Sequence, residues 1–88
     1  CNGHAELCNR SYGNITFLGV HDSFAWSTDV LAQVDLPTQL ALGARLLQGQ
    51  THMNGDAIHL CHTNCILFDG GPLVDYLSQV KTFLDANP

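Results

Sequence analysis

Two histidines are the strongest candidates in this sequence for acid–base chemistry. His21 comes directly after the apolar residues 14–20, and His62 comes directly after residues 57–61. Imidazole titrates near neutrality, so two of them facing one pocket can serve as general base and general acid in transfer at phosphorus. Asp22 follows His21 directly, and an aspartate at this position can cap a short helix or turn. The two positions thus predict a candidate site at His21 and His62.

Strands and helices must bring the two histidines to the same edge of the protein. The local sequence patterns predict several such elements. Each predicted element rests on apolar spacing or on Pro, Gly and Asn signals at its ends. We expect a buried strand over 14–20, a loop with one helical turn over 23–36, a helix over 37–43, a strand over 45–50, a turn at 54–56 before an apolar run at 57–60, and an amphipathic helix over 72–86.

Strand, helix, strand, strand, helix is the order with which an α/β fold begins. Parallel strands need helices to cover them, and ligands collect at the carboxyl ends of such strands. The run at 57–60 can also pair with the residues before the Asn-Gly turn as an antiparallel hairpin. We therefore predict an α/β protein in which His21 and His62 follow strand ends.

Composition bounds the size and the partners of the chain. Its 88 residues make one domain at most, and 45% hydrophobic against 12% charged residues fits a piece of a larger protein. The net charge of −5 argues against nucleic acid as a partner. No apolar run reaches the ~20 residues of a membrane-spanning helix. We expect the gene product to be longer than this chain.

Four cysteines form two local pairs. An even number of cysteines in a short exported chain indicates a disulfide framework, for which four cysteines allow three connectivities. We favour Cys1 with Cys8 and Cys61 with Cys65, because short loops cost the least entropy to close.

Further features point to export. The triplets that begin at Asn9 and Asn14 match the N-glycosylation pattern. The chain starts at Cys1 without methionine, which we interpret as removal of a leader. We therefore expect a secreted, extracellular glycoprotein.

Four segments together resemble one protein family. Residues 19–23 (GVHDS) look like the G-[TA]-H-[DN]-S segment that opens the X-domain of phosphatidylinositol-specific phospholipases C. Residues 42–47 (LGARLL) are similar to its second strand, residues 58–62 (IHLCH) to its second histidine strand, and residues 82–88 (TFLDANP) to the end of the next helix. The cysteines resemble those of a secreted fungal branch of this superfamily.

The resemblance implies a fold and a reaction. It covers about the first third of a TIM-type (β/α) barrel, which typically needs ~250 residues. His21 would take the proton from the attacking inositol hydroxyl, Asp22 would tune its environment, and His62 would protonate the leaving alkoxide. The implied substrate is a phosphodiester of the phosphoinositide type.

One part of the family pattern is missing. The family neutralises the phosphate with arginine or with calcium held by acidic residues, and the matching positions here are Gln48 and Gln50. His52 is a candidate replacement, so we predict that these three residues bind substrate. No metal or other cofactor is expected, with calcium as the alternative, because calcium on Asp22 alone would lack most of its oxygen ligands. Arg45 is expected to support the fold.

A second, non-catalytic function is also open. Unpaired strand edges and an apolar composition invite association, so the chain could be a secreted, self-assembling structural or binding polypeptide. Under either function we expect self-association or association with a missing C-terminal part.

Overall fold

The structure, a computed structural model, describes residues 1–26 and 34–88 as five strands, two α-helices and two short 3₁₀ turns. In chain order these elements are η1 (Ala5–Leu7), η2 (Tyr12–Asn14), β1 (Leu18–Val20), α1 (Leu36–Ala41), β2 (Ala44–Leu47), β3 (Thr51–Asn54), β4 (Ala57–Cys61), β5 (Asp69–Pro72) and α2 (Leu73–Ala86).

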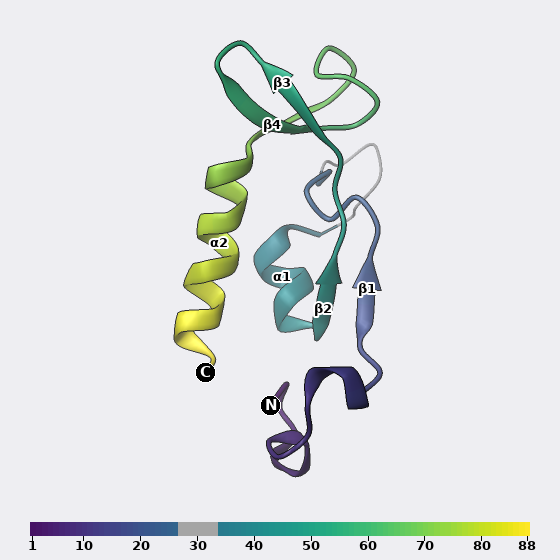
Figure 1. The fold of residues 1–88 in the computed structure, drawn as a ribbon, viewed down its shortest axis with the longest axis vertical. Helices are drawn as coiled ribbons and strands as arrows, with labels where there is room; N and C mark the ends of the chain where they lie inside the picture. Colours follow the sequence, from purple (N-terminus) through teal and green to yellow (C-terminus); the bar gives the residue numbers. More distant parts are fainter. Residues whose placement is uncertain (27–33) are drawn as a thin grey trace.

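The strands form two small sheets that follow one another along the molecule (Figure 1). β1 and β2 are parallel, with α1 in the connection between them, and β3, β4 and β5 form an antiparallel sheet in that order. The extended residues 48–50 join the sheets. The Gln48 N–H donates to the Val20 carbonyl at 3.1 Å, and the Cys61 N–H donates to the Gln50 carbonyl at 3.0 Å. The end of β1 and the end of β4 are thereby tied to one segment.

The α/β class predicted from sequence is confirmed, and so is the antiparallel hairpin around the Asn-Gly turn. No closed barrel is formed by the described part of the chain. The expectation of a buried strand over 14–20 is wrong, since β1 has only three residues and Leu18 is 58% exposed. In the described residues β1 pairs with β2 alone and belongs to a two-stranded sheet. Part of the loop predicted over 23–36, residues 27–33, lies outside the described residues.

The core lies where the two sheets meet and is built around Phe24. Phe24 is 8% exposed and packs with Ala25 and Leu60, against which Phe68, Leu73 and Tyr76 also pack. A Cβ on Gly49 would stand 2.8 Å from the Phe24 ring, and one on Gly70 would stand 2.7 Å from its other edge. The backbone approaches the ring on two sides, which only glycine permits.

Helix α1 begins after an aspartate cap that was not predicted from the sequence, and it ends at the glycine that was. The Asp35 carboxylate accepts a hydrogen bond from the Thr38 N–H at 3.0 Å, and this bond lowers the pKa of Asp35. Pro37 lies in the first turn, where its missing N–H costs nothing. Gly43, with φ of +103°, turns the chain from the helix into β2.

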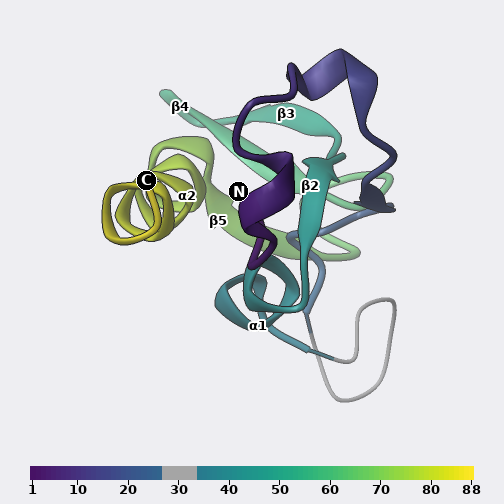
Figure 2. The ribbon, with the colours of Figure 1, turned by 90° about the horizontal axis from the view of Figure 1, so that it is seen from below.

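Helix α2 runs alongside α1 and reaches the antiparallel sheet with its first turn (Figures 1 and 2). Its apolar stripe is only partly covered, since Leu77 and Leu84 are each about half exposed. The radius of gyration is 14.4 Å, against about 12 Å for a compact domain of this length. The described residues therefore form an elongated body with much apolar surface in contact with solvent.

Both predicted disulfides are confirmed. Cys1 is bonded to Cys8 and Cys61 to Cys65. Among the described residues, no helix is long and apolar enough to cross a membrane.

Strand β5 was not predicted, because its sequence Asp-Gly-Gly-Pro is typical of a turn. It is held by Asp69, whose carboxylate lies 2.8 Å from His59 Nδ1 on β4 and also accepts hydrogen bonds from the Asn54 side chain and the Gly71 N–H. His59, and then the Gly71 N–H, hold the pKa of Asp69 below its ordinary value of 3.8.

These contacts predict how the stability of the antiparallel sheet depends on pH. A carboxylate with a lowered folded-state pKa contributes stability that is complete above pH 3.8 and is lost as the pH falls through the folded value. Asp69→Asn should therefore lower the free energy of unfolding near pH 5 and flatten its decline toward about pH 2. Urea unfolding across this range measures it. Asp56→Asn, at an exposed carboxylate in the hairpin turn, is the control and should keep the wild-type slope.

Candidate functional site

The residues predicted from sequence to carry acid–base chemistry lie together. Nε2 of His21 is 3.1 Å from Oδ2 of Asp22, and Nε2 of His62 is 3.6 Å from the same oxygen. The carboxylate is only 3% exposed, whereas the His21 side chain is 79% exposed and that of His62 is 33% exposed. One buried acid thus stands between two imidazoles that solvent can reach.

Asp22 is positioned by its backbone. It directly follows His21 at the end of β1 and has φ of +47°, a conformation that Asp tolerates better than most residues. Its N–H donates to Oε1 of Gln48 at 2.9 Å, and its carbonyl accepts from the Ala25 N–H at 2.9 Å. The turn over residues 22–25 points the carboxylate at the histidines, so the side chain does not cap this turn.

Ser23 fixes the turn to the body of the protein. Its N–H and its hydroxyl both donate to the Gln48 carbonyl, at 3.0 and 3.1 Å. Its oxygen also lies 2.6 Å from the Tyr76 hydroxyl on α2, and the Gln39 side chain donates to its carbonyl. Burial raises the pKa of Tyr76, so the phenol stays protonated and able to donate. The segment 48–50, α1 and α2 therefore all hold Ser23 in place beside Asp22.

His62 is held by the hairpin and by a disulfide. It follows β4 directly, and its N–H donates to the Phe68 carbonyl at 3.2 Å. Cys61 is fully buried and bonded to Cys65, which closes the loop that carries His62. Thr63, with φ of +65°, reverses the chain there and brings its hydroxyl to 3.4 Å from Nδ1 of His62.

Asp22 is the acidic partner of both imidazoles. Oδ1 of Asp22 is buried without a hydrogen-bond partner among the described residues, and Oδ2 is the oxygen that both imidazoles approach. A buried carboxylate stabilises the cation that forms when a histidine accepts a proton. Over residues 1–26 and 34–88, no three His, Cys, Asp or Glu side chains are arranged as metal ligands.

The three residues predicted to bind substrate lie at three different positions in the fold. Gln48 is beside the site, and its Oε1 is engaged by the Asp22 N–H. Gln50 is exposed on the segment that leads into β3. His52 pairs with His59 across β3 and β4, and strand alternation puts it on the face opposite Leu60, which packs on Phe24. Their roles in binding stay a prediction.

The cationic side chains all lie away from the two histidines. Arg10 is in the N-terminal loop, Arg45 is in β2 and Lys81 is in α2. Arg45 donates to the carbonyls of Leu40 and Ala44 and stacks 5.0 Å from the Phe83 ring centre, as expected of a residue that supports the fold. No Lys or Arg is thus available at the site to neutralise a phosphate.

Two side-chain contacts were not predicted from the sequence. Tyr76 lies 53 positions from Ser23 and looks like an ordinary member of an amphipathic helix. His59 on β4 pairs with Asp69, which lies in a segment with the composition of a turn. Neither contact has a signal in the local residue spacing. The first depends on how α2 packs, and the second on the register of β5.

The fold and the site together define an α/β protein with paired histidines around a buried aspartate at strand ends. The family model PI-PLC X 1 matches residues 7–88. Two proteins of Arthroderma benhamiae are each 45% identical over 91 residues and cover all of this chain: "PI-PLC X domain-containing protein 1", of which the match is 30%, and "Uncharacterized secreted protein", of which it is 21%. The chain belongs to the PI-PLC X family.

The chain spans less than a third of the length of these two relatives. No solved structure matches it significantly.

Proposed function

We propose that this chain carries the acid–base site of a phosphodiesterase of the phospholipase C type, acting on a phosphoinositide lipid. The observation that supports it most is the convergence of His21 and His62, which are 41 positions apart, on one buried oxygen of Asp22. Membership of the PI-PLC X family supports the choice of substrate class.

In this proposal the two imidazoles divide the proton transfers. His21, exposed at the rim, takes the proton from the inositol hydroxyl that attacks phosphorus. His62 gives a proton to the diacylglycerol oxygen as its bond to phosphorus breaks. Asp22 contacts both rings, so it can stabilise whichever of them carries the positive charge.

The same proposal includes the setting of the site. We infer that β1, α1, β2 and the segments after them are the beginning of a TIM-type barrel, with the histidines at its carboxyl-terminal rim. Two disulfides and the secreted relative favour an extracellular protein. Asn9 and Asn14 are exposed and remain candidates for glycosylation. No metal has a part in the proposed steps, and a role for calcium would need ligands beyond Asp22.

A non-catalytic role is favoured by a different observation. No lysine or arginine stands at the site, whereas large apolar side chains such as Leu18, Leu46 and Ile58 are about half exposed. Such a surface suits self-association or docking with further sequence. Under this alternative the histidine pair is inherited from the family and does no chemistry.

The test is product analysis. The purified chain, incubated with phosphatidylinositol vesicles, should release a water-soluble inositol phosphate and diacylglycerol, and it should leave phosphatidylcholine intact. The double variant His21→Ala/His62→Ala should release neither. If wild type and the double variant release the same traces while both remain folded by circular dichroism, the non-catalytic role stands instead.

A further inference from the structure

A cavity lies at the end of the β1–β2 sheet opposite the histidines. This cavity of about 260 Å³ lies between the N-terminal loop and the start of β2. Ile15 and Phe17 line it from the segment before β1, and Arg45 lines it from β2. Since β1 and β2 are parallel, this cavity faces away from the ends that carry His21 and the turn after it.

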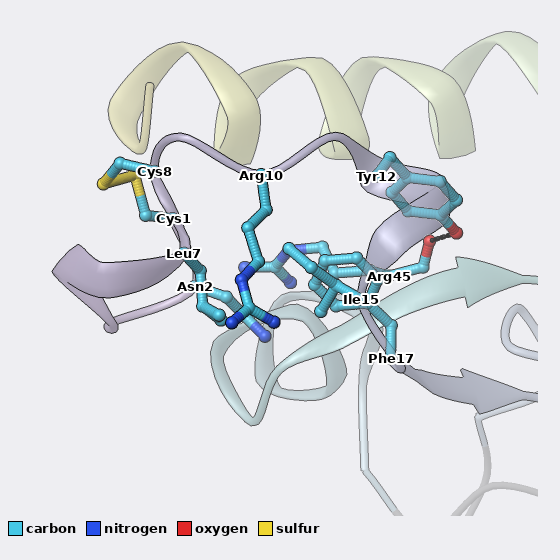
Figure 3. A pocket seen from close by; sticks show the side chains of 9 residues that line it. All are labelled: Cys1, Asn2, Leu7, Cys8, Arg10, Tyr12, Ile15, Phe17 and Arg45. Carbon is cyan, nitrogen blue, oxygen red and sulfur yellow. Dashed lines mark hydrogen bonds between the residues drawn. A yellow bond between two sulfur atoms is a disulfide. The ribbon is translucent and has the colours of Figure 1, made fainter.

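The cavity gathers most of the positive charge of an acidic chain. The sequence has three Lys and Arg against eight Asp and Glu, yet two of those three, Arg10 and Arg45, line this one cavity. Figure 3 shows Arg10 reaching from the loop with its guanidinium toward the Asn2 amide, while the Arg45 side chain passes behind it. No carboxylate lines the cavity among the described residues, and neither arginine is in an ion pair there.

The two arginines differ in which of their hydrogen-bond donors are already used. Nη1 of Arg45 is fixed by two carbonyls, so this residue supplies a charge held in place. Arg10 is exposed and makes no hydrogen bond through its side chain within the described residues, so its fork of donors is open to a ligand. Guanidinium groups recognise carboxylate and phosphate oxygens in pairs of parallel hydrogen bonds.

The remaining wall is apolar and aromatic. Tyr12 and Phe17 stack with ring centres 5.0 Å apart, and the Tyr12 hydroxyl donates to the Arg45 carbonyl at 3.0 Å, which ties the loop to β2. Ile15 and Leu7 complete this wall. Ligand sites typically measure ~300–1,000 Å³, so a cavity of this size suits a single ring or a short chain.

We propose that this cavity binds a small soluble oxyanion, a carboxylate or phosphate monoester carrying one apolar ring or short chain. Arg10 pairs with the oxyanion, Arg45 adds its fixed charge, and the Tyr12 and Phe17 wall takes the apolar body. The site is separate from the histidines and does not depend on their function.

The experiment is a chemical-shift titration of the purified chain with phenyl phosphate, benzoate and the neutral analogue benzyl alcohol. The two anions should saturate and move the signals of Leu7, Arg10 and Tyr12 but not those of His21 or His62. Benzyl alcohol should not saturate. Arg10→Gln should weaken binding of the anions at least about tenfold. Lys81→Gln removes the same charge from an exposed pair with Asp85 and should change binding less than about twofold.

Four results would overturn this site. They are saturable binding of benzyl alcohol as tight as that of benzoate, equal losses in the Arg10 and Lys81 variants, shifts centred on the histidines, and Arg10-dependent binding to phosphatidylserine vesicles without binding of the soluble probes. Failure of the phosphodiesterase assay would leave this titration unaffected, because the two experiments report on opposite ends of the sheet.

Discussion

Under the proposed phosphodiesterase function, replacing His62 by alanine is expected to slow cleavage of phosphatidylinositol by about 10²- to 10⁴-fold, because the glycerol alkoxide would have to leave without a proton. The loss should be much smaller for inositol 4-nitrophenyl phosphate, whose leaving group is stable as an anion and needs little protonation. The ratio of kcat/KM values for the two substrates, in wild type and variant, measures this difference. It assigns the acid role to His62 alone.

The partner variant and a matched control complete the design. His21→Ala removes the base, so it should slow both substrates to a similar extent. His4→Ala removes an exposed histidine of the N-terminal loop whose one ion-pair partner among the described residues is Glu6, at 3.4 Å, and should leave both rates at the wild-type level. Equal losses on both substrates in the His62 variant would contradict the assignment and would point to a role in binding.

The parts of the fold that sequence predicted well are those with local causes. The two disulfides close loops of only a few residues, so loop entropy alone favoured their pairing. Helix α1 has an Asp cap and an early Pro, and the hairpin has an Asn-Gly turn. In each case the signal lies within a few positions of the element that it specifies.

Strands β1 and β5 show where local signals fail. Residues 14–20 have strong strand composition, but Tyr12–Asn14 form a 3₁₀ turn and only the last three residues pair with β2. β5 has the opposite character, since its composition is that of a turn and its pairing depends on β4 and on Asp69 reaching His59. Strand propensity depends on the partner that a strand finds, which a single sequence does not specify.

The residues of the candidate site could be predicted from the sequence, but the contact between Asp22 and His62 could not. The predicted strand ends put His21 and His62 on one rim, and the family resemblance suggested Asp22. The expectation gave Asp22 to His21 alone, whereas its Oδ2 also lies 3.6 Å from His62. The additional contact arises because residues 48–50 tie the end of β1 to the end of β4, an arrangement of backbone hydrogen bonds without a side-chain pattern.

Phe24→Ala is expected to have the largest effect on stability of any single change in the described core. Deleting a buried phenyl ring costs about 3–5 kcal/mol, and the whole chain of 88 residues is expected to have only about 4–13 kcal/mol of unfolding free energy. Phe24 is two positions from Asp22, so the turn that presents the carboxylate should be lost with the core. Urea unfolding measures the loss, and Phe24→Leu, which keeps most of the volume, should lose much less.

A double-mutant cycle with Gly49 tests whether the ring is held as the structure has it. Gly49→Ala alone should destabilise the protein by about 1–3 kcal/mol, since its Cβ would stand 2.8 Å from Phe24 and 2.9 Å from the flexible end of Leu60. With Phe24→Ala already present, most of this clash disappears and the new methyl group fills part of the cavity. The two costs should therefore sum to more than the cost of the double variant. Additive costs would mean that the ring does not lie against Gly49, and the position of the turn that carries Asp22 would then be wrong as well.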